Sequence, residues 1–296
     1  MNLTCDQNII WIASYPKSGN TWVRAFIHNL LNEMSGVKDA QDINQLNSHT
    51  IWEFAAKPFE RVLGKSLTAA DQGEIAAARP EVQRKLANGR TEPVLVKTHL
   101  CVGNEYQHPT INLNATLAAI YVVRNPLDVA ISYAHHSSTR LDAMIATMAT
   151  PGMKTPDTAQ AAYQILGSWS QNVASWLGLA DRPVHVIRYE DLLANPLRPF
   201  GTLARFLGLK PSEQQLKAAI AKSSFGELRR QESENGFNER PKTAKVFFRE
   251  GRAGQWRDVL SSSQIQEITR VHAPMMQRLG YLPPDCGKPL RLKQMA

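Results

Sequence analysis

The chain has 296 residues, of which 43% are hydrophobic, enough to bury a large core. No Gly/Ser-rich linker or break in composition divides it, so we expect a single domain over residues 1–296. Its 34 Lys and Arg outnumber its 26 Asp and Glu, which gives a net charge of +8. That excess suits an anionic ligand, nucleic acid or a membrane surface. The basic residues are dispersed rather than clustered, which disfavours nucleic acid.

The cysteines and the N-terminus indicate a cytoplasmic protein without a membrane span. Cys5, Cys101 and Cys286 are far apart and odd in number, so they predict neither a disulfide framework nor a metal site. The first residues are polar and carry no signal-peptide core. No apolar run approaches the length that a membrane crossing requires.

Alternating strand and helix patterns predict the fold. Four apolar or β-branched runs indicate buried parallel strands: Ile9–Ser14, Val94–Thr98, 118–123 and Val184–Arg188. Apolar stripes at helical spacing lie at 22–31, 166–177, 200–207 and 265–275. We therefore expect an α/β, P-loop-like domain with a central, mostly parallel sheet flanked by helices on both faces. Ligands of such sheets bind beyond the carboxyl ends of the strands.

Three segments show no clear pattern of this kind. Residues 41–90 are polar and weakly periodic, and we expect them to be helical. Residues 226–245 are rich in Glu, Arg, Asn and Gly, which indicates a mobile loop. The basic tail 288–296 is interpreted as a solvated terminus.

A cation and small hydrogen-bonding residues follow the first predicted strand: Lys17, Ser18, Gly19, Asn20 and Thr21. An amphipathic segment begins directly after them. The N-terminus of a helix offers unpaired N–H groups and the positive end of a dipole, so this loop predicts an anion site. A Walker A loop has its Lys after the second Gly, whereas Lys17 precedes Gly19 here. The loop therefore differs from that of the common nucleotide hydrolases.

A second anion site is predicted where the strand 118–123 ends. Arg124 follows that strand, Asn125 can cap a helix, and Pro126 suits its first position. Ser132 lies two turns into that helix. Arg suits bidentate phosphate binding, whereas the alternative is a surface pair of Arg124 with Asp128.

The strand Val94–Thr98 carries a candidate base at its exit. His99 follows Lys97 and Thr98, and a His at the mouth of the sheet can act as a general base near neutral pH. The other histidines lack such a setting: His28, His49, His108, His135, His136, His185 and His272.

A glycine-containing segment near the C-terminus adds a weaker signal. Gly251 and Gly254 lie between Arg249, Arg252 and Arg257. Glycines let backbone N–H groups approach a phosphate, and arginines supply positive charge. The alternative is an ordinary turn between two helices.

Together these features suggest group transfer from a doubly phosphorylated nucleotide, without a metal-ligand cluster. A P-loop kinase or NTPase is the main alternative, and it would need a Walker A lysine and a metal-holding Asp at the end of a strand. The strand 118–123 is followed by Arg124 instead. A binding module without activity would have no need of Lys17 and His99.

The chain resembles the sulfotransferases that use 3′-phosphoadenosine 5′-phosphosulfate (PAPS), from about residue 9 to 254. The loop from Tyr15 to Trp22 resembles the family's 5′-phosphosulfate loop, Arg124 and Ser132 its 3′-phosphate site, and Lys97-Thr98-His99 its catalytic segment. Further segments resemble its adenine-side contacts and its closing RxGxxGxW motif: Tyr189-Glu190-Asp191, Ser223-Ser224-Phe225, Arg249 and Gly251 to Gly254.

The resemblance implies a role for each of these residues. His99 would take a proton from an acceptor hydroxyl or amine, and Lys17 would stabilise the leaving bridging oxygen. Lys97 would assist, and Ser132 would hold the 3′-phosphate and restrain Lys17. Trp22 and Phe225 would stack on adenine.

The sequence also departs from the family. Glu250 stands where a second basic residue is frequent, which makes Arg252 a possible substitute beside Arg249. The animal-type dimer motif is not matched at 257–266, so the oligomeric state stays open. Other details resemble bacterial members, some of which sulfate natural products. The resemblance implies a small-molecule acceptor, bound by the variable regions 41–90, 136–163 and 226–245.

Overall fold

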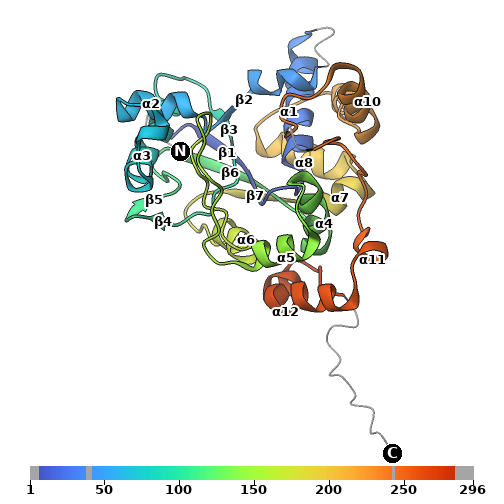
Figure 1. Cartoon of the computed structure of the whole chain (residues 1–296). Coiled ribbons are helices and arrows are strands. Elements are labelled where there is room, and N and C mark those ends of the chain that lie inside the picture. Colours follow the sequence, from blue (N-terminus) through green and yellow to red (C-terminus); the bar gives the residue numbers. More distant parts are fainter. Residues whose placement is uncertain (1–6, 38–41, 242–243, 284–296) are drawn as a thin grey trace, which may run out of the picture.

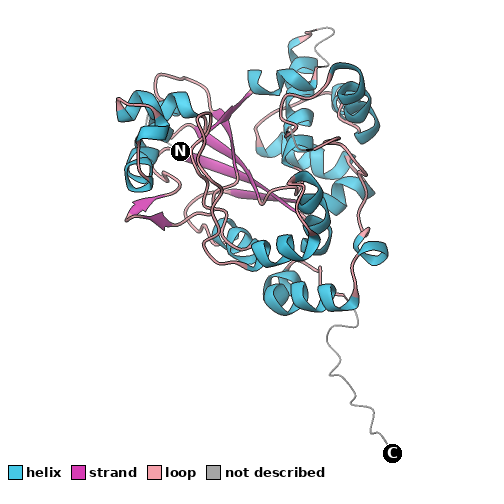
Figure 2. Ribbon diagram, viewed as in Figure 1, coloured by secondary structure: helices cyan, strands magenta, loops and turns pink. Residues whose placement is uncertain are grey.

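Five parallel strands form the central sheet of the computed structural model, which describes residues 7–37, 42–241 and 244–283. Their order across the sheet is β2-β3-β1-β6-β7, and every neighbouring pair is parallel (Figures 1 and 2). The strands are β1 Ile9–Ser14, β2 Thr50–Trp52, β3 Val94–Thr98, β6 Thr116–Val123 and β7 Val184–Arg188. A hairpin of β4 Asn104–Glu105 and β5 His108–Pro109 lies outside this sheet. The predicted α/β architecture is confirmed.

The edge strand β2 was not predicted. Its three residues are too few to show the period of a strand. It pairs with β3, where Thr50 lies opposite Leu95, inside a region that we expected to be helical throughout. Helices do make up much of the described part of that region: η1 Ile43–Ser48, α2 Ala56–Leu63, η2 Leu67–Ala69 and α3 Gln72–Ala87.

Helices cover both faces of the sheet. On one face α3 is joined by α4 Pro126–His136, α5 Leu141–Ala149, α6 Trp169–Leu177 and α12 Ser262–Arg278. The other face carries α1 Asn20–Ser35, α7 Tyr189–Ala194, α8 Leu197–Phe206 and α9 Glu213–Lys222. The side chains of β1 alternate between these layers, so that Trp11 packs in the first cluster and Ile12 in the second. Burial on both faces explains why the strand is an apolar run.

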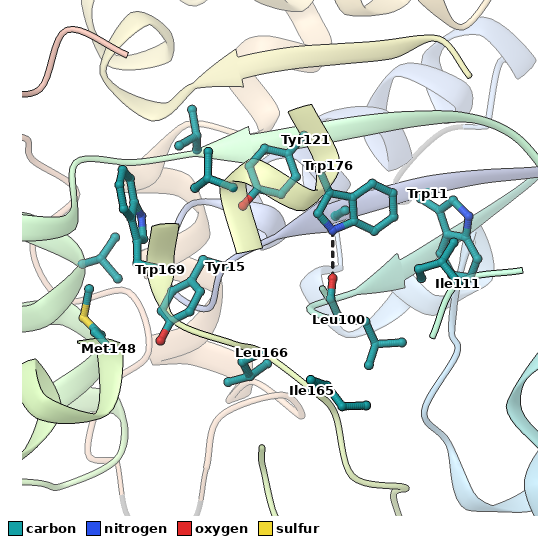
Figure 3. Packing of buried hydrophobic residues seen from close by; sticks show 14 of the residues in the cluster. Trp11, Tyr15, Leu100, Ile111, Tyr121, Met148, Ile165, Leu166, Trp169 and Trp176 are labelled. Atoms are coloured by element: carbon teal, nitrogen blue, oxygen red, sulfur yellow. Dashed lines mark hydrogen bonds between the residues drawn. The ribbon is translucent and has the colours of Figure 1, made fainter. Parts of the chain in front are cut away.

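The larger cluster fixes the chain where β3 ends (Figure 3). The Trp176 ring packs against Trp11 and Tyr121, with centroids 6.4 and 6.3 Å apart. Its Nε1 donates a hydrogen bond of 2.8 Å to the carbonyl of Leu100, one residue after His99. Buried Trp N–H groups need such a partner. The core therefore anchors the segment that carries the candidate base.

The prediction of a mobile loop at 226–245 is wrong for its first half. Helix α10 spans Phe225–Asn235, and Ser224 caps it by accepting a hydrogen bond from the backbone N–H of Glu227. Arg230 pairs with Glu227 and Glu234 along this helix. Such pairs stabilise a helix without an apolar stripe, which is why hydrophobic periodicity did not reveal it.

Some predictions fall on residues that are not described: Cys5, Gln41, Lys242, Thr243, Cys286 and the tail 288–296. Cys101 is described and is a buried free thiol. None of the described helices has the length and apolar character that crossing a membrane requires. The last short helix, α11, spans Trp256–Val259.

Candidate functional site

A cavity of about 270 Å³ lies at the carboxyl ends of β1, β3 and β6. Most of the predicted site residues line it: Lys17, Gly19, Asn20, Thr21, Trp22, Lys97, His99, Arg124, Ser132, Tyr189, Phe225, Arg249 and Gly251. These residues come from segments that are far apart in the sequence. The fold therefore brings the predicted loops together around one space, as expected for a parallel sheet.

The loop after β1 leaves the start of α1 open to a ligand. Gly19 is the N-cap residue, at φ 108°, and no side chain caps the helix. A Cβ atom on Gly19 would lie 2.8 Å from the Tyr189 ring, so glycine is required here. The first turn of α1 has no acidic residue. Its N–H groups and the helix dipole are therefore available to an anion.

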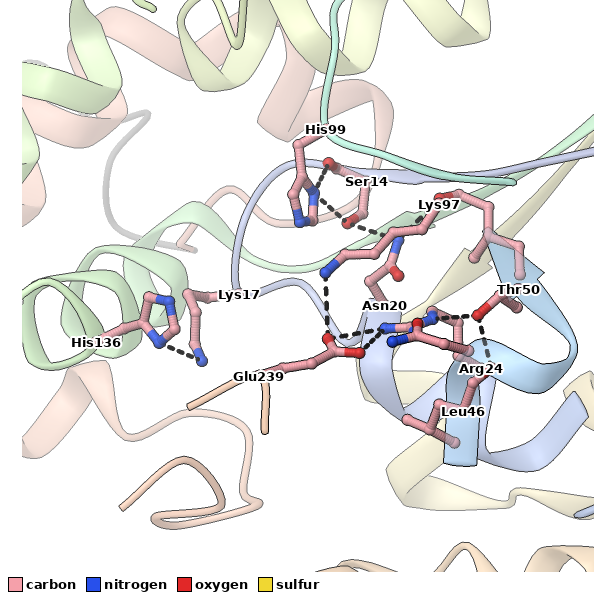
Figure 4. A network of polar contacts seen from close by, with 12 residues as sticks. Ser14, Lys17, Asn20, Arg24, Leu46, Thr50, Lys97, His99, His136 and Glu239 are labelled. Atoms are coloured by element: carbon pink, nitrogen blue, oxygen red, sulfur yellow. Dashed lines mark hydrogen bonds and ion pairs between the residues drawn. The ribbon is translucent and has the colours of Figure 1, made fainter. Parts of the chain in front are cut away.

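Lys17 lines the cavity and is held there by two side-chain contacts. Its backbone has a positive φ of 64°, which is costly for a side chain other than glycine and is a feature of functional loops. Its Nζ donates to His136 Nδ1 at 3.2 Å (Figure 4). The same Nζ lies 3.9 Å from the centroid of the Phe247 ring. Burial lowers the pKa of Lys17 to about 7, and the Arg124 and Lys97 cations add to the shift. An anion bound beside Lys17 would raise this pKa again.

His99 has the tautomer that a general base needs. Its Nδ1–H donates to the carbonyl of Ser14 at 2.8 Å, which leaves Nε2 with a free lone pair (Figure 4). Burial lowers its pKa to about 3, and the nearby Lys97 cation contributes. The imidazole is therefore neutral near pH 7. Asn172 and Gln164 fix its backbone by hydrogen bonds of 2.9 and 3.2 Å.

Lys97 belongs to a buried network of charges. Its Nζ lies 3.3 Å from Glu239 Oε2 and 4.6 Å from the centroid of the Trp52 ring. Glu239 also pairs with the fully buried Arg24 at 2.8 Å (Figure 4). Burial by itself would raise the pKa of Glu239, but the Lys97 and Arg24 cations outweigh it, so the pKa lies below its usual value. The carboxylate is therefore ionised.

Arg124 lies where the second anion site was predicted. Asn125 caps α4 by accepting from the N–H of Leu127 at 3.0 Å, as expected. The Arg124 guanidinium stacks on Tyr189 at 4.3 Å and donates to the carbonyls of Lys17 and Arg252. Its Nε is buried without a hydrogen-bond partner in the described part of the chain.

The alternative pairing of Arg124 with Asp128 does not occur. The Asp128 carboxylate is buried and accepts from the backbone N–H groups of Gly254 at 2.7 Å and Trp256 at 3.0 Å. It therefore ties the closing segment to the first turn of α4.

Two contacts hold the closing segment over the cavity. The buried Glu232 accepts from the N–H groups of Phe247 and Phe248, at 2.7 and 2.9 Å. A Cβ atom on Gly251 would lie within 2.5 Å of the Phe225 ring, at a φ of 62°. Only glycine allows this close approach of backbone and ring.

Three predicted residues do not line the cavity. Ser18 is buried in the loop, and its Oγ has no partner among the described residues. Ser223 is fully buried and bonds to Asn29 and to the carbonyl of Ala219. The side chain of Arg252 pairs with Asp258 at 3.0 Å on the surface, and only its backbone carbonyl reaches Arg124.

Sequence reasoning missed several residues of the cavity, among them His136, Glu239 and Phe247. His136 stands one helical turn after Ser132, so spacing alone would have placed it on the same face of α4. The other two lie in a segment without periodicity, and no signal in it points to Glu239. Among the described residues, no group of three or more His, Cys, Asp and Glu side chains forms a metal site.

Comparison with known proteins agrees with this geometry. A family model described as "Sulfotransferase domain" matches residues 7–280. Sulfotransferase 1B1 of the dog (Canis lupus familiaris) is 28% identical over 278 residues, which covers 90% of this chain and 83% of that protein. Bovine (Bos taurus) Sulfotransferase 1A1 is 26% identical over 269 residues, covering 88% and 80%.

Solved structures share the fold. Retinol dehydratase in complex with androsterone and the inactive cofactor PAP aligns with a TM-score of 0.63 at 19% identity, covering 96% of this chain and 84% of that one. Mouse sulfotransferase SULT7A1 complexed with PAP gives a TM-score of 0.56, also at 19% identity, covering 94% and 86%.

Proposed function

The chain belongs to the sulfotransferase family, and we propose that it transfers a sulfuryl group from PAPS to a hydroxyl or amine of a small-molecule acceptor, releasing 3′-phosphoadenosine 5′-phosphate (PAP). The arrangement of Lys17, His99 and Arg124 around one cavity carries this proposal. Ser18 Oγ and Arg124 Nε, buried without partners in the described residues, support it further. Buried polar atoms are rarely left unpaired, and phosphate oxygens would pair them.

The donor fits the residues of the cavity from its 5′ end to its adenine. Lys17, Ser18 and the N–H groups from Gly19 to Thr21 would hold the 5′-phosphosulfate. Arg124, Ser132 and Arg249 would hold the 3′-phosphate, with the N–H of Gly251 close by. Adenine would lie between Trp22 and Phe225, next to Tyr189. Ser223, whose Oγ accepts from Asn29 of α1, would hold the chain two residues before Phe225.

The proposed reaction uses His99 and Lys17 in succession. The His99 Nε2 lone pair accepts the proton of the acceptor hydroxyl, whose oxygen attacks the sulfur. The bond between sulfur and the bridging oxygen breaks, and PAP leaves with the electron pair of that bond. The Lys17 ammonium stabilises the charge that develops on the bridging oxygen. Lys97 adds positive charge from the side of the acceptor, although its pair with Glu239 reduces that contribution.

The proposal includes several finer predictions made from the sequence. One domain, 1–296, would carry the activity, and regions 41–90, 136–163 and 226–245 would form the acceptor side. The named relatives are animal proteins. The inferred bacterial origin, cytoplasmic location and absence of a nucleic-acid partner stay predictions. Ser132 is proposed to restrain Lys17 together with His136, the residue to which Lys17 donates.

Ligand-induced thermal shifts test the proposal against the kinase alternative. We expect PAP to raise the melting temperature more than ATP or ATP–Mg²⁺ at equal concentration, because only PAP supplies the 3′-phosphate for Arg124. Preferential stabilisation by ATP–Mg²⁺ would favour a kinase and contradict the proposal. Labelled PAPS then tests transfer directly.

A further inference from the structure

The part of the cavity beyond His99 is not needed for the donor. We call it the acceptor arm and define it by Lys97, His136, Thr155, Gln164, Glu239 and Phe247. These residues come from β3, the end of α4, the segment after α5 and the loop after α10. Their chemistry decides which acceptor the arm can hold.

A pair of opposite charges forms one wall of the arm. Lys97 and Glu239 keep 10% and 8% of their side chains exposed, and both line the cavity (Figure 4). An apolar ring pressed against this wall would remove the water from both charges and return no hydrogen bond. That desolvation is costly for ionised groups. Hydroxyl groups would replace the water instead.

A second wall presents the side-chain amide of Gln164. Gln164 is 8% exposed, and its Oε1 accepts the His99 N–H at 3.2 Å. The backbone N–H of Gln164 donates to Thr155 Oγ1 at 2.9 Å, which fixes this segment. The Gln164 side chain lines the cavity, so its amide can reach a ligand there. The amide N–H groups at such a wall can donate to an oxygen of the ligand.

A neutral imidazole completes the polar lining. Burial and the Lys17 cation lower the pKa of His136 to about 3, and its Nδ1 accepts from Lys17. When Lys17 engages a bound donor, this Nδ1 becomes free to accept from a hydroxyl of the acceptor.

Part of the aromatic surface in this region is already occupied. The Phe247 ring is covered by the Lys17 ammonium at 3.9 Å. Met144 and Met148, which are close in sequence to the arm, are buried in the core. Leu166, Leu228, Tyr133 and Phe248 also line the cavity.

On the basis of the proposed function, we infer that the acceptor is a small, multiply hydroxylated molecule of the cyclitol or sugar class. One hydroxyl faces His99 Nε2, and its neighbours replace water at the Lys97–Glu239 pair, at Gln164 Nε2 and at His136 Nδ1. The arm thereby selects against flat apolar phenols and sterols, which cannot satisfy these groups.

A matched pair of acceptors tests this inference. Inositol and cyclohexanol share a six-carbon ring and differ only in the number of hydroxyls. With labelled PAPS, we expect kcat/KM for inositol to exceed that for cyclohexanol by about tenfold, since two or more hydrogen bonds separate them. Calorimetric binding of both compounds to the PAP-loaded protein is measured in parallel, so the comparison does not depend on turnover.

Two variants locate the selectivity. His136→Phe and Gln164→Leu should each lower the inositol-to-cyclohexanol ratio by about fivefold. His135→Phe is the matched control, because the neighbouring side chain is exposed and lies outside the cavity. We expect it to leave the ratio unchanged.

The outcomes separate this inference from the proposed function. A ratio of one or less, a phenol sulfated in preference to inositol, or no binding of inositol to the PAP-loaded protein overturns the polyol inference. Each of these results leaves the sulfotransferase proposal standing, provided that PAP still stabilises the protein. Failure of PAP to bind would overturn the proposed function first.

Discussion

The two ends of the cavity balance their charge differently. At the donor end, Lys17 and Arg124 have no carboxylate partner among the described residues, and their contacts are with an imidazole, aromatic rings and carbonyls. In the acceptor arm, Lys97 is paired with Glu239, which also binds Arg24. The donor end therefore lacks an anion, whereas the acceptor arm compensates most of its own charge.

This difference explains how one cavity can receive two unlike substrates. A highly anionic nucleotide is attracted only where cations are uncompensated. The acceptor arm attracts a second anionic nucleotide only weakly, because Glu239 already neutralises the charge of Lys97. His99 lies at the border between the two ends.

Removal of the His99 imidazole should have the largest effect on activity. We expect His99→Ala to lower kcat by about 10²–10⁴, because proton transfer from the acceptor is lost. The Kd for PAP, measured by calorimetry, should stay unchanged. His135→Ala, an exposed neighbour of the cavity, serves as the control. Full activity of His99→Ala would remove it as the base, and a parallel loss of PAP binding would place it at the donor end.

Removal of the negative charge of Glu239 in the acceptor arm should lower the stability of the fold. Glu239→Gln leaves Lys97 and Arg24 as buried cations without a counter-charge, so we expect the free energy of unfolding to fall by about 3 kcal/mol. Urea unfolding measures the change. Glu234→Gln is the control, because that carboxylate is half exposed in its pair with Arg230 and should cost less than about 1 kcal/mol. Similar losses for both variants would mean that Glu239 is not the counter-charge of a buried network.

The same contrast separates what sequence could predict from what it could not. Donor-end residues lie in short motifs, where a strand, a loop and a helix start follow one another, so Lys17 and Arg124 could be placed from local patterns. The acceptor arm is assembled by tertiary packing. Glu239 reaches Lys97 across 142 residues, and His136 reaches Lys17 across 119. No local sequence pattern predicts such long-range contacts.

Helix α10 and strand β2 were missed for related reasons. The helix is stabilised by a cap and by charged pairs rather than by an apolar face, and the strand is too short to show a period. The Arg252 side chain was weighed as a phosphate ligand because of its spacing, yet Asp258 and Glu250 hold it on the surface. The direction of a side chain that follows a glycine turn, such as that of Arg252, cannot be predicted from residue spacing alone.

At the donor end, the 3′-phosphate assignment can be tested with a pair of ligands. Arg124→Ala should weaken PAP binding by about 10- to 100-fold, since hydrogen bonds to a charged group are lost, and should change the binding of adenosine 5′-phosphate much less. Calorimetry gives both Kd values. Equal weakening of the two nucleotides would contradict the assignment. Arg252→Ala provides a comparison, and we expect a change of less than about threefold from this surface residue.

The smallest expected effect is a pH dependence that belongs to Lys17. Its pKa of about 7 reflects burial and the Arg124 and Lys97 cations, opposed by Glu232, and a bound phosphate raises it. Below pH 7 Lys17 is already charged and PAP binds most tightly. Above pH 7 binding must take up a proton, so the affinity falls by at most about tenfold per pH unit.

Lys17→Arg isolates this contribution, because a guanidinium stays charged throughout the range. Ionisation of the PAP phosphates affects both proteins equally, so the difference between their log Kd values reports Lys17 alone. We expect that difference to grow from pH 7 to pH 9 and to be constant below pH 6. Parallel curves of log Kd against pH for the two proteins would contradict this prediction. They would show that Lys17 is already charged before PAP binds, and that another group balances the positive charge of the donor end.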